Sequence, residues 1–97
     1  MTDRELLEAA AKAEGHAYPW MLPAGFGERP WNPLTDDGDA LRLAVRRGLF
    51  FKPDFFHFLS LERFVGQDRD DCHATRRAIV RAAAAIGGAT GAGDSHD

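Results

Sequence analysis

The segment from residue 16 to residue 34 most constrains how this chain can fold. It contains four prolines and two glycines, at Pro19, Pro23, Pro30, Pro33, Gly25 and Gly27. Proline breaks a helix interior, so this segment excludes a long helix. It also carries large apolar side chains that a solvated linker would not usually hold: Tyr18, Trp20, Met21, Leu22, Phe26 and Trp31. We therefore expect a short strand or two with tight turns, at 17–22 and 28–32, packed against the core.

A helical pattern precedes this segment. Residues 2–14 begin with Thr2 and Glu5, which have the spacing of a capping box. Apolar residues then recur at helical intervals, and Gly15 can take the left-handed conformation that ends a helix.

Two further helical patterns follow it. One begins with Thr35 as the expected N-cap, has acids in its first turn and stops at Gly48. Leu41, Val45 and the neighbouring Ala44 form its apolar stripe, which we expect to face the core. The other covers residues 71–87, with Asp70 or Asp71 as its cap, an alanine-rich apolar side and a glycine pair at its end.

Between these two helices the sequence favours strands. Residues 49–51 have the pattern of a buried strand that ends at Lys52-Pro53-Asp54. Residues 55–65 are apolar on both sides and fit neither period cleanly. The alternation in their first half favours a strand that pairs with 49–51, while the pattern of 61–65 would also suit a helical turn.

These elements predict the α+β class. We expect three helices packed on a small, mainly antiparallel sheet, like an alpha-beta-alpha sandwich, in the order α-β-β-α-β-β-α. The 97 residues leave room for one domain, at 1–88. Residues 89–97 hold no large apolar side chain and are expected to form a disordered tail.

Composition excludes several classes. No run approaches the roughly 20 apolar residues of a membrane helix, and the charged N-terminus does not resemble a signal peptide. We expect a cytoplasmic protein that does not bind membranes. A single cysteine, Cys72, excludes an internal disulfide and a multi-cysteine zinc site. A net charge of −3 and a pI near 5.7 argue against a general nucleic-acid-binding surface.

Three blocks of the chain, at 1–13, 31–45 and 74–87, resemble in this order the small phage and prophage proteins of the phage alpha-beta-alpha sandwich domain family. The run Trp31-Asn32-Pro33-Leu34 is the most specific part. The resemblance implies a sheet layered with helices and a phage or prophage origin. It implies no reaction, since no catalytic motif comes with it. The chain departs from the family in the proline-rich segment before Trp31 and in the aromatic run from 50 to 64.

No motif predicts catalysis or a cofactor. Residues 35–39 lack the ligand spacing of a calcium loop and suit a helix start instead. Cys72 and His73 would point about 100° apart on a helix, and His57 adds no recognisable spacing. We therefore expect no enzyme, no metal or other cofactor and no small-molecule substrate.

Two groups of arginines are candidates for binding a partner. They lie on the second and third expected helices, at Arg42, Arg46, Arg47, Arg76, Arg77 and Arg81. If these helices pack side by side, the guanidinium groups could form one face for phosphates or for a protein. The alternative, which we favour, is that they lie on solvated helix faces with local ion pairs.

The aromatic residues are the second group of candidates. Ten of them are more than a core of this size readily hides, and large exposed aromatics anchor interfaces. Trp20, Phe55 and Phe56 are the expected exposed anchors, and an open sheet edge could pair two copies. The alternative is that the core takes all ten.

The expected function is that of a phage or prophage accessory protein. It would act as a non-catalytic module that binds a host protein, a phage protein or its own copy, for example as an inhibitor of bacterial anti-phage defence. That last step rests on origin and not on a site. The alternative is a small nucleic-acid-binding module that uses the arginines.

Overall fold

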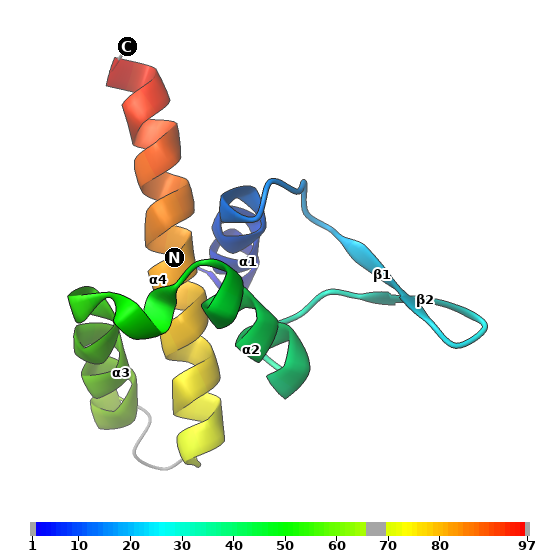
Figure 1. Ribbon diagram of the computed structural model, residues 1–97, viewed down its shortest axis with the longest axis horizontal. Helices are drawn as coiled ribbons and strands as arrows, with labels where there is room; N and C mark the ends of the chain where they lie inside the picture. Colours follow the sequence, from blue (N-terminus) through cyan, green and yellow to red (C-terminus); the bar gives the residue numbers. More distant parts are fainter. Residues whose placement is uncertain (1, 66–69, 97) are drawn as a thin grey trace.

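The structure is a computed structural model that describes residues 2–65 and 70–96 (Figure 1). Within these residues the protein is α+β, with four α-helices, a short 3₁₀ helix and one two-stranded antiparallel sheet. The elements are α1 (Asp3–Ala13), β1 (Met21–Ala24), β2 (Gly27–Pro30), α2 (Asp37–Arg46), η1 (Leu49–Phe51), α3 (Pro53–Val65) and α4 (Asp71–His96). The predicted class is confirmed. The three predicted helices and the order α-β-β-α-β-β-α do not match.

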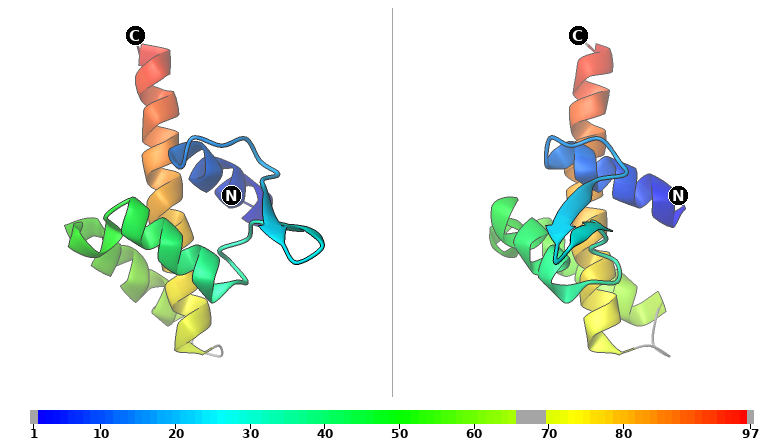
Figure 2. Two further views of the ribbon diagram at one scale, coloured as in Figure 1. Left: turned by 45° about the vertical axis from the view of Figure 1, so that its right-hand side comes forward. Right: turned by 90° about the vertical axis from the view of Figure 1, so that its right-hand side faces the viewer.

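The long helix α4 is the central element. Helices α1, α2 and α3 all pack against it (Figures 1 and 2). The core between α1 and α4 is rich in alanine, including Ala10, Ala11, Ala78, Ala82 and Ala83. Because alanine projects only a methyl group, the two backbones can approach closely.

Gly87 of α4 lies against the backbone of α1. A Cβ atom at this position would overlap the carbonyl group of Ala9 and lie 3.3 Å from the backbone nitrogen of Ala13. The sequence predicts that the helix ends at Gly87, but α4 continues to His96. The prediction is wrong because glycine fits a close helix crossing as well as a helix end.

The backbone beyond the glycine pair is helical through His96, where the sequence predicts a disordered tail. Once a helix has formed, each added residue costs little, so small residues can extend it. Residue 97 lies outside the described residues. Disorder of 89–97 stays a prediction.

The first helix confirms its predicted ends. The Thr2 hydroxyl accepts from the Glu5 backbone, and the Glu5 carboxylate accepts from the Thr2 backbone. In α2 the N-cap is Asp36, whose carboxylate accepts from the Asp39 backbone at 2.8 Å, and not the predicted Thr35. Aspartate competes well for this position because it also interacts favourably with the helix dipole.

The proline-rich segment forms two short strands with a tight turn, as predicted, with shifted bounds, and the strands pair as a β-hairpin. Strands β1 and β2 pair with Met21 opposite Pro30 and Ala24 opposite Gly27. Gly25 in the turn has a φ of 58°, a conformation that favours glycine. The hairpin projects away from the helices (Figure 1). Only its base packs on the core, where Trp20 lies 5.0 Å from the buried Trp31 between ring centroids.

Residues 49–65 are helical, and the two predicted strands are wrong. Pro53 is the first residue of α3, a position that favours proline because it needs no backbone donor. Phe55 packs into the core while Phe56 beside it is exposed. The pattern is apolar on both sides because α3 carries apolar residues beyond the side that packs on α4, and this resembled a buried strand.

Candidate protein-binding surface

Asp39 is the centre of a buried ionic cluster that joins the hairpin to α2. Arg29 of β2 donates two hydrogen bonds to its carboxylate, at 2.8 and 2.7 Å. Arg42 donates a third at 2.8 Å, and the backbone of Asn32 donates a fourth at 3.0 Å. The Asp39 side chain has no exposed surface.

This environment sets the charge of Asp39. Burial alone would raise the pKa of the carboxyl group. The hydrogen bonds from Arg29, the Asn32 backbone and Arg42 outweigh it and lower the pKa from 3.8 to about 2. The sequence predicts only a helix-start acid here, because Arg29 lies in another element.

Two more carboxylates are buried beside arginines. Glu14, at the end of α1, lies 3.2 Å from Arg46 and 3.5 Å from Arg47, both near the end of α2. Arg47 also donates to the carbonyl oxygen of Ala13 at 3.0 Å. These contacts join the C-terminal ends of α1 and α2.

Glu62 of α3 is the third carboxylate that is buried beside arginines. It forms ion pairs with Arg77 and Arg81 of α4, and Arg77 also pairs with Asp3 of α1 at 3.0 Å. One arginine therefore bridges three helices.

Arg76 joins α4 to the start of α2. It donates to the carbonyl oxygen of Leu34 at 2.9 Å and to Asp37 at 2.6 Å. Each of the six candidate arginines thus contacts a carboxylate of this chain, so the structure does not bring them together as one free cationic face.

The three candidate aromatic anchors have different places. Phe56 is exposed, as predicted. Phe55 is 4% exposed and belongs to the core, so its prediction as a surface anchor is wrong. Phe55 faces the core from α3. Trp20 is half-buried, stacked on His16 with ring centroids 3.7 Å apart.

Other large apolar side chains are exposed that the sequence did not single out. They are Met21, Phe26, Leu41, Val45, Phe50, Phe51, Leu61 and Phe64. Leu41 and Val45 belong to the stripe expected to be the buried side of the second helix. Without the position of α4, the sequence could not distinguish the covered side of α2 from its uncovered side.

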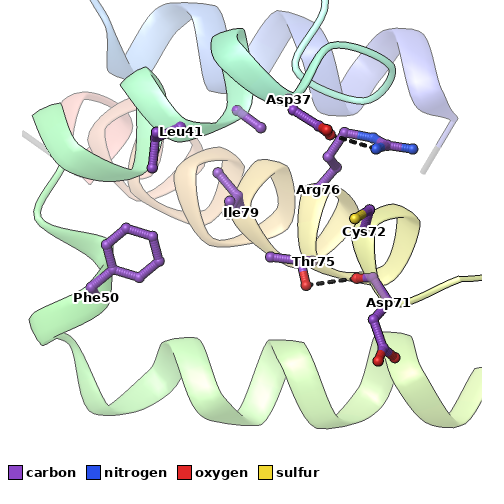
Figure 3. Close-up of a pocket in the computed structure, with 9 residues that line it drawn as sticks. Asp37, Leu41, Phe50, Asp71, Cys72, Thr75, Arg76 and Ile79 are labelled. Atoms are coloured by element: carbon purple, nitrogen blue, oxygen red, sulfur yellow. Dashed lines mark hydrogen bonds and ion pairs between the residues drawn. The ribbon is translucent and has the colours of Figure 1, made fainter.

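A surface pocket of about 270 Å³ lies between α2, η1 and α4, and we call it the α2–α4 groove. Its lining includes Leu41, Phe50, Cys72, Thr75, Arg76 and Ile79. Leu41 and Phe50 lie at one end, Cys72 and Arg76 toward the other, and Ile79 and Thr75 between them (Figure 3). An apolar pocket with a few polar groups is typical of a binding site.

The polar end of the groove carries two ion pairs. Asp37 and Asp71 both line it, and their side chains are 74% and 82% exposed. Arg76 pairs with Asp37, and Arg63 lies 3.5 Å from Asp71. A ligand of this groove would meet an apolar floor and carboxylates at one end.

The remaining candidate chemistry gives no cluster. Cys72 is exposed and lies at the groove. Among residues 2–65 and 70–96, no three His, Cys, Asp or Glu side chains gather as metal ligands would. In the same residues, no helix has the length and apolar character needed to cross a membrane.

Comparison of the chain with protein-family models, with curated proteins and with solved structures gives no match.

Proposed function

We propose that this chain is a phage or prophage accessory protein that acts without catalysis, by binding another protein in the α2–α4 groove. The observation that carries the binding role is the groove itself, a pocket of about 270 Å³ with Leu41, Phe50 and Ile79 in its lining. The phage origin rests on the resemblance of the helical blocks.

The groove favours one kind of ligand. Its volume exceeds the roughly 150 Å³ of an apolar cavity that holds a benzene ring, so one or two apolar side chains fit. Asp37 and Asp71 each pair with an arginine but stay largely exposed, so a basic residue of the partner can share their carboxylates. The expected partner segment is therefore apolar with a basic flank, such as one turn of an amphipathic helix.

The sharper form of the proposal is inhibition of a bacterial defence system. A protein that only occupies a partner's surface needs no active site, which suits a chain of 97 residues with an exposed apolar groove. The host or phage partner would lose access to the segment that the groove covers.

The test is a plating assay with a matched pair of variants. The chain is expressed in hosts that carry defined defence systems, and the plating efficiency of a restricted phage is measured. Wild type should raise plating at least tenfold on one of these hosts. Leu41→Glu should abolish the effect, because it places a carboxylate over the apolar floor. Phe26→Ser, a change of an exposed aromatic on the hairpin, should retain it.

Equal activity of Leu41→Glu and wild type would contradict the groove as the site. No effect on any host would contradict the inhibitory role. Charge reversal at Arg76 and Arg77 is a poorer test, because both side chains form internal ion pairs and the change would unfold the protein before it reported on a partner.

A further inference from the structure

Helix α3 carries large apolar side chains on the side that faces away from the core. Phe56, Leu61 and Phe64 are 64%, 47% and 75% exposed. Phe55, on the opposite side, is buried against the rest of the molecule. A helix that is apolar all round is normally covered on all sides, but α3 is covered on one.

The polarity of α3 is reversed from that of an ordinary surface helix. Its glutamate, Glu62, is 7% exposed and faces Arg77 and Arg81 of α4. Phe56 and Phe64 face solvent instead. A shortage of polar residues in α3 does not explain the exposed aromatic face, because the helix buries its Glu62 carboxylate while aromatic side chains are in solvent.

The exposed residues lie together on the helix. Positions 56, 60 and 64 are four residues apart, and 61 and 64 are three apart, so their side chains lie along one stripe. Ser60 and His57 are the polar side chains within this stripe, and Asp54 and Arg63 lie at its two edges, seven residues from Leu61 and Phe56. Charged groups at the edges can remain in water when the middle of the stripe is covered.

The size of this face matches a dimer interface. With about 200 Å² for each of these side chains, the exposed parts of Phe56, Leu61 and Phe64 amount to about 370 Å² of apolar surface. A stable interface of ordinary size buries about 800 Å² on each partner, of which slightly more than half is apolar. The face supplies most of that apolar area.

We infer that the outer face of α3 is the interface between two copies of this chain, related by a two-fold axis that passes near Ser60. A two-fold interface places the same patch on both sides, so the patch must complement itself. A stripe of phenylalanine and leucine with a serine at its middle does so in an antiparallel helix pair. This dimer is independent of the groove and of its partner.

Sedimentation equilibrium of the full chain tests the inference. At a chain concentration of about 100 μM, wild type should have twice the chain mass of 10.7 kDa. The double variant Phe56→Ser/Phe64→Ser should have the mass of one chain and keep its helical circular dichroism. Phe26→Ser, which changes an even more exposed phenylalanine on the hairpin, should remain a dimer. A monomeric wild type, or a dimer that persists in the double variant, would overturn the inference.

Cross-linking gives a second reading that does not depend on how the double variant folds. Ser60→Cys in a Cys72→Ser background should form covalent dimers with a short bismaleimide, because helices in contact lie about 8–10 Å apart. Glu28→Cys in the same background should not. Absence of the Ser60→Cys product would refute the α3 interface. Failure of the plating assay alone would count against the groove and leave the dimer standing.

Discussion

Asp39 determines where the hairpin attaches to the helices. Its carboxylate is fully buried and accepts from side chains on both sides, Arg29 of β2 and Arg42 of α2. The backbone of Asn32, within the Trp-Asn-Pro-Leu run, donates to the same carboxylate. The run therefore has a structural role. It places a backbone donor beside the buried carboxylate of Asp39, and its Trp31 and Leu34 side chains are buried in the core.

The low pKa of Asp39 predicts a dependence of stability on pH. The folded-state pKa of about 2 lies below the value of 3.8 for a free carboxyl group, so the folded state favours the charged form. The contribution, about 2 kcal/mol, is complete above pH 4 and is lost as pH falls to about 2. Urea unfolding should show that Asp39→Asn lowers the free energy of unfolding by about 2–3 kcal/mol at pH 7.

The difference between wild type and Asp39→Asn should shrink as pH falls from 4 through the folded-state pKa of about 2, because the Asp39 carboxylate is progressively protonated. Asp71→Asn is the matched control, because its ion pair with Arg63 is exposed on both sides. That variant should change stability by less than about 0.5 kcal/mol at any of these pH values. A constant difference between Asp39→Asn and wild type would show that the carboxylate is not held ionised by the cluster.

At the scale of elements, Gly87 fixes how closely α4 crosses α1. Gly87→Ala would place a methyl group on the carbonyl of Ala9, which is backbone and cannot rotate away. The helices must separate, and thermal or urea unfolding should show a loss of about 2–3 kcal/mol. Gly27→Ala has open space around its Cβ and should stay within about 0.5 kcal/mol of wild type. Equal effects of the two changes on the free energy of unfolding would mean that α1 and α4 can separate at Gly87 with little loss of stability.

The starts of α1 and α4 and the short strands with their tight turn could be predicted from the sequence because each depends on local chemistry. Capping residues and turn glycines act over three or four residues, as Thr2 with Glu5 and Asp70 with the His73 backbone show. α3 could not be predicted, because its two-sided apolar pattern is explained only by its single covered side. The groove was missed for the same reason: Leu41 lies in a stripe that predicts burial, and only the placement of η1 leaves it open.

The predicted tail gives a second test at this scale. Deletion of residues 89–97 should change the free energy of unfolding by less than about 0.5 kcal/mol, because this segment holds no large apolar side chain to bury. Amide exchange in the full chain should show the last protected amides near Gly87, where α4 meets α1. Protection that continues to residue 96, or a loss of more than 1 kcal/mol on deletion, would contradict the prediction of a disordered tail.

At the scale of the whole molecule, opposite charges neutralise each other at the joints between elements. The buried or half-buried carboxylates Asp39, Glu14 and Glu62 each contact two arginines. These pairs connect the hairpin to α2, α1 to α2 and α3 to α4. The chain can thus carry many arginines with a net charge of −3 and no large cationic face made from the six candidates.

This arrangement predicts weak binding to nucleic acid, with an affinity that depends little on salt concentration. A phosphate would have to replace a carboxylate that an arginine already contacts, so fluorescence anisotropy with a generic DNA duplex should give a Kd weaker than about 100 μM at 0.15 M salt. The slope of log K against log salt should be small, because each phosphate neutralised contributes about −0.9. Glu14→Gln is the informative comparison, since it frees Arg46 and Arg47 and should strengthen binding and steepen the slope by up to about two contacts. A wild-type slope steeper than about −4 would require at least four arginines to exchange their carboxylates for phosphates, and would favour the nucleic-acid module over the protein-binding one.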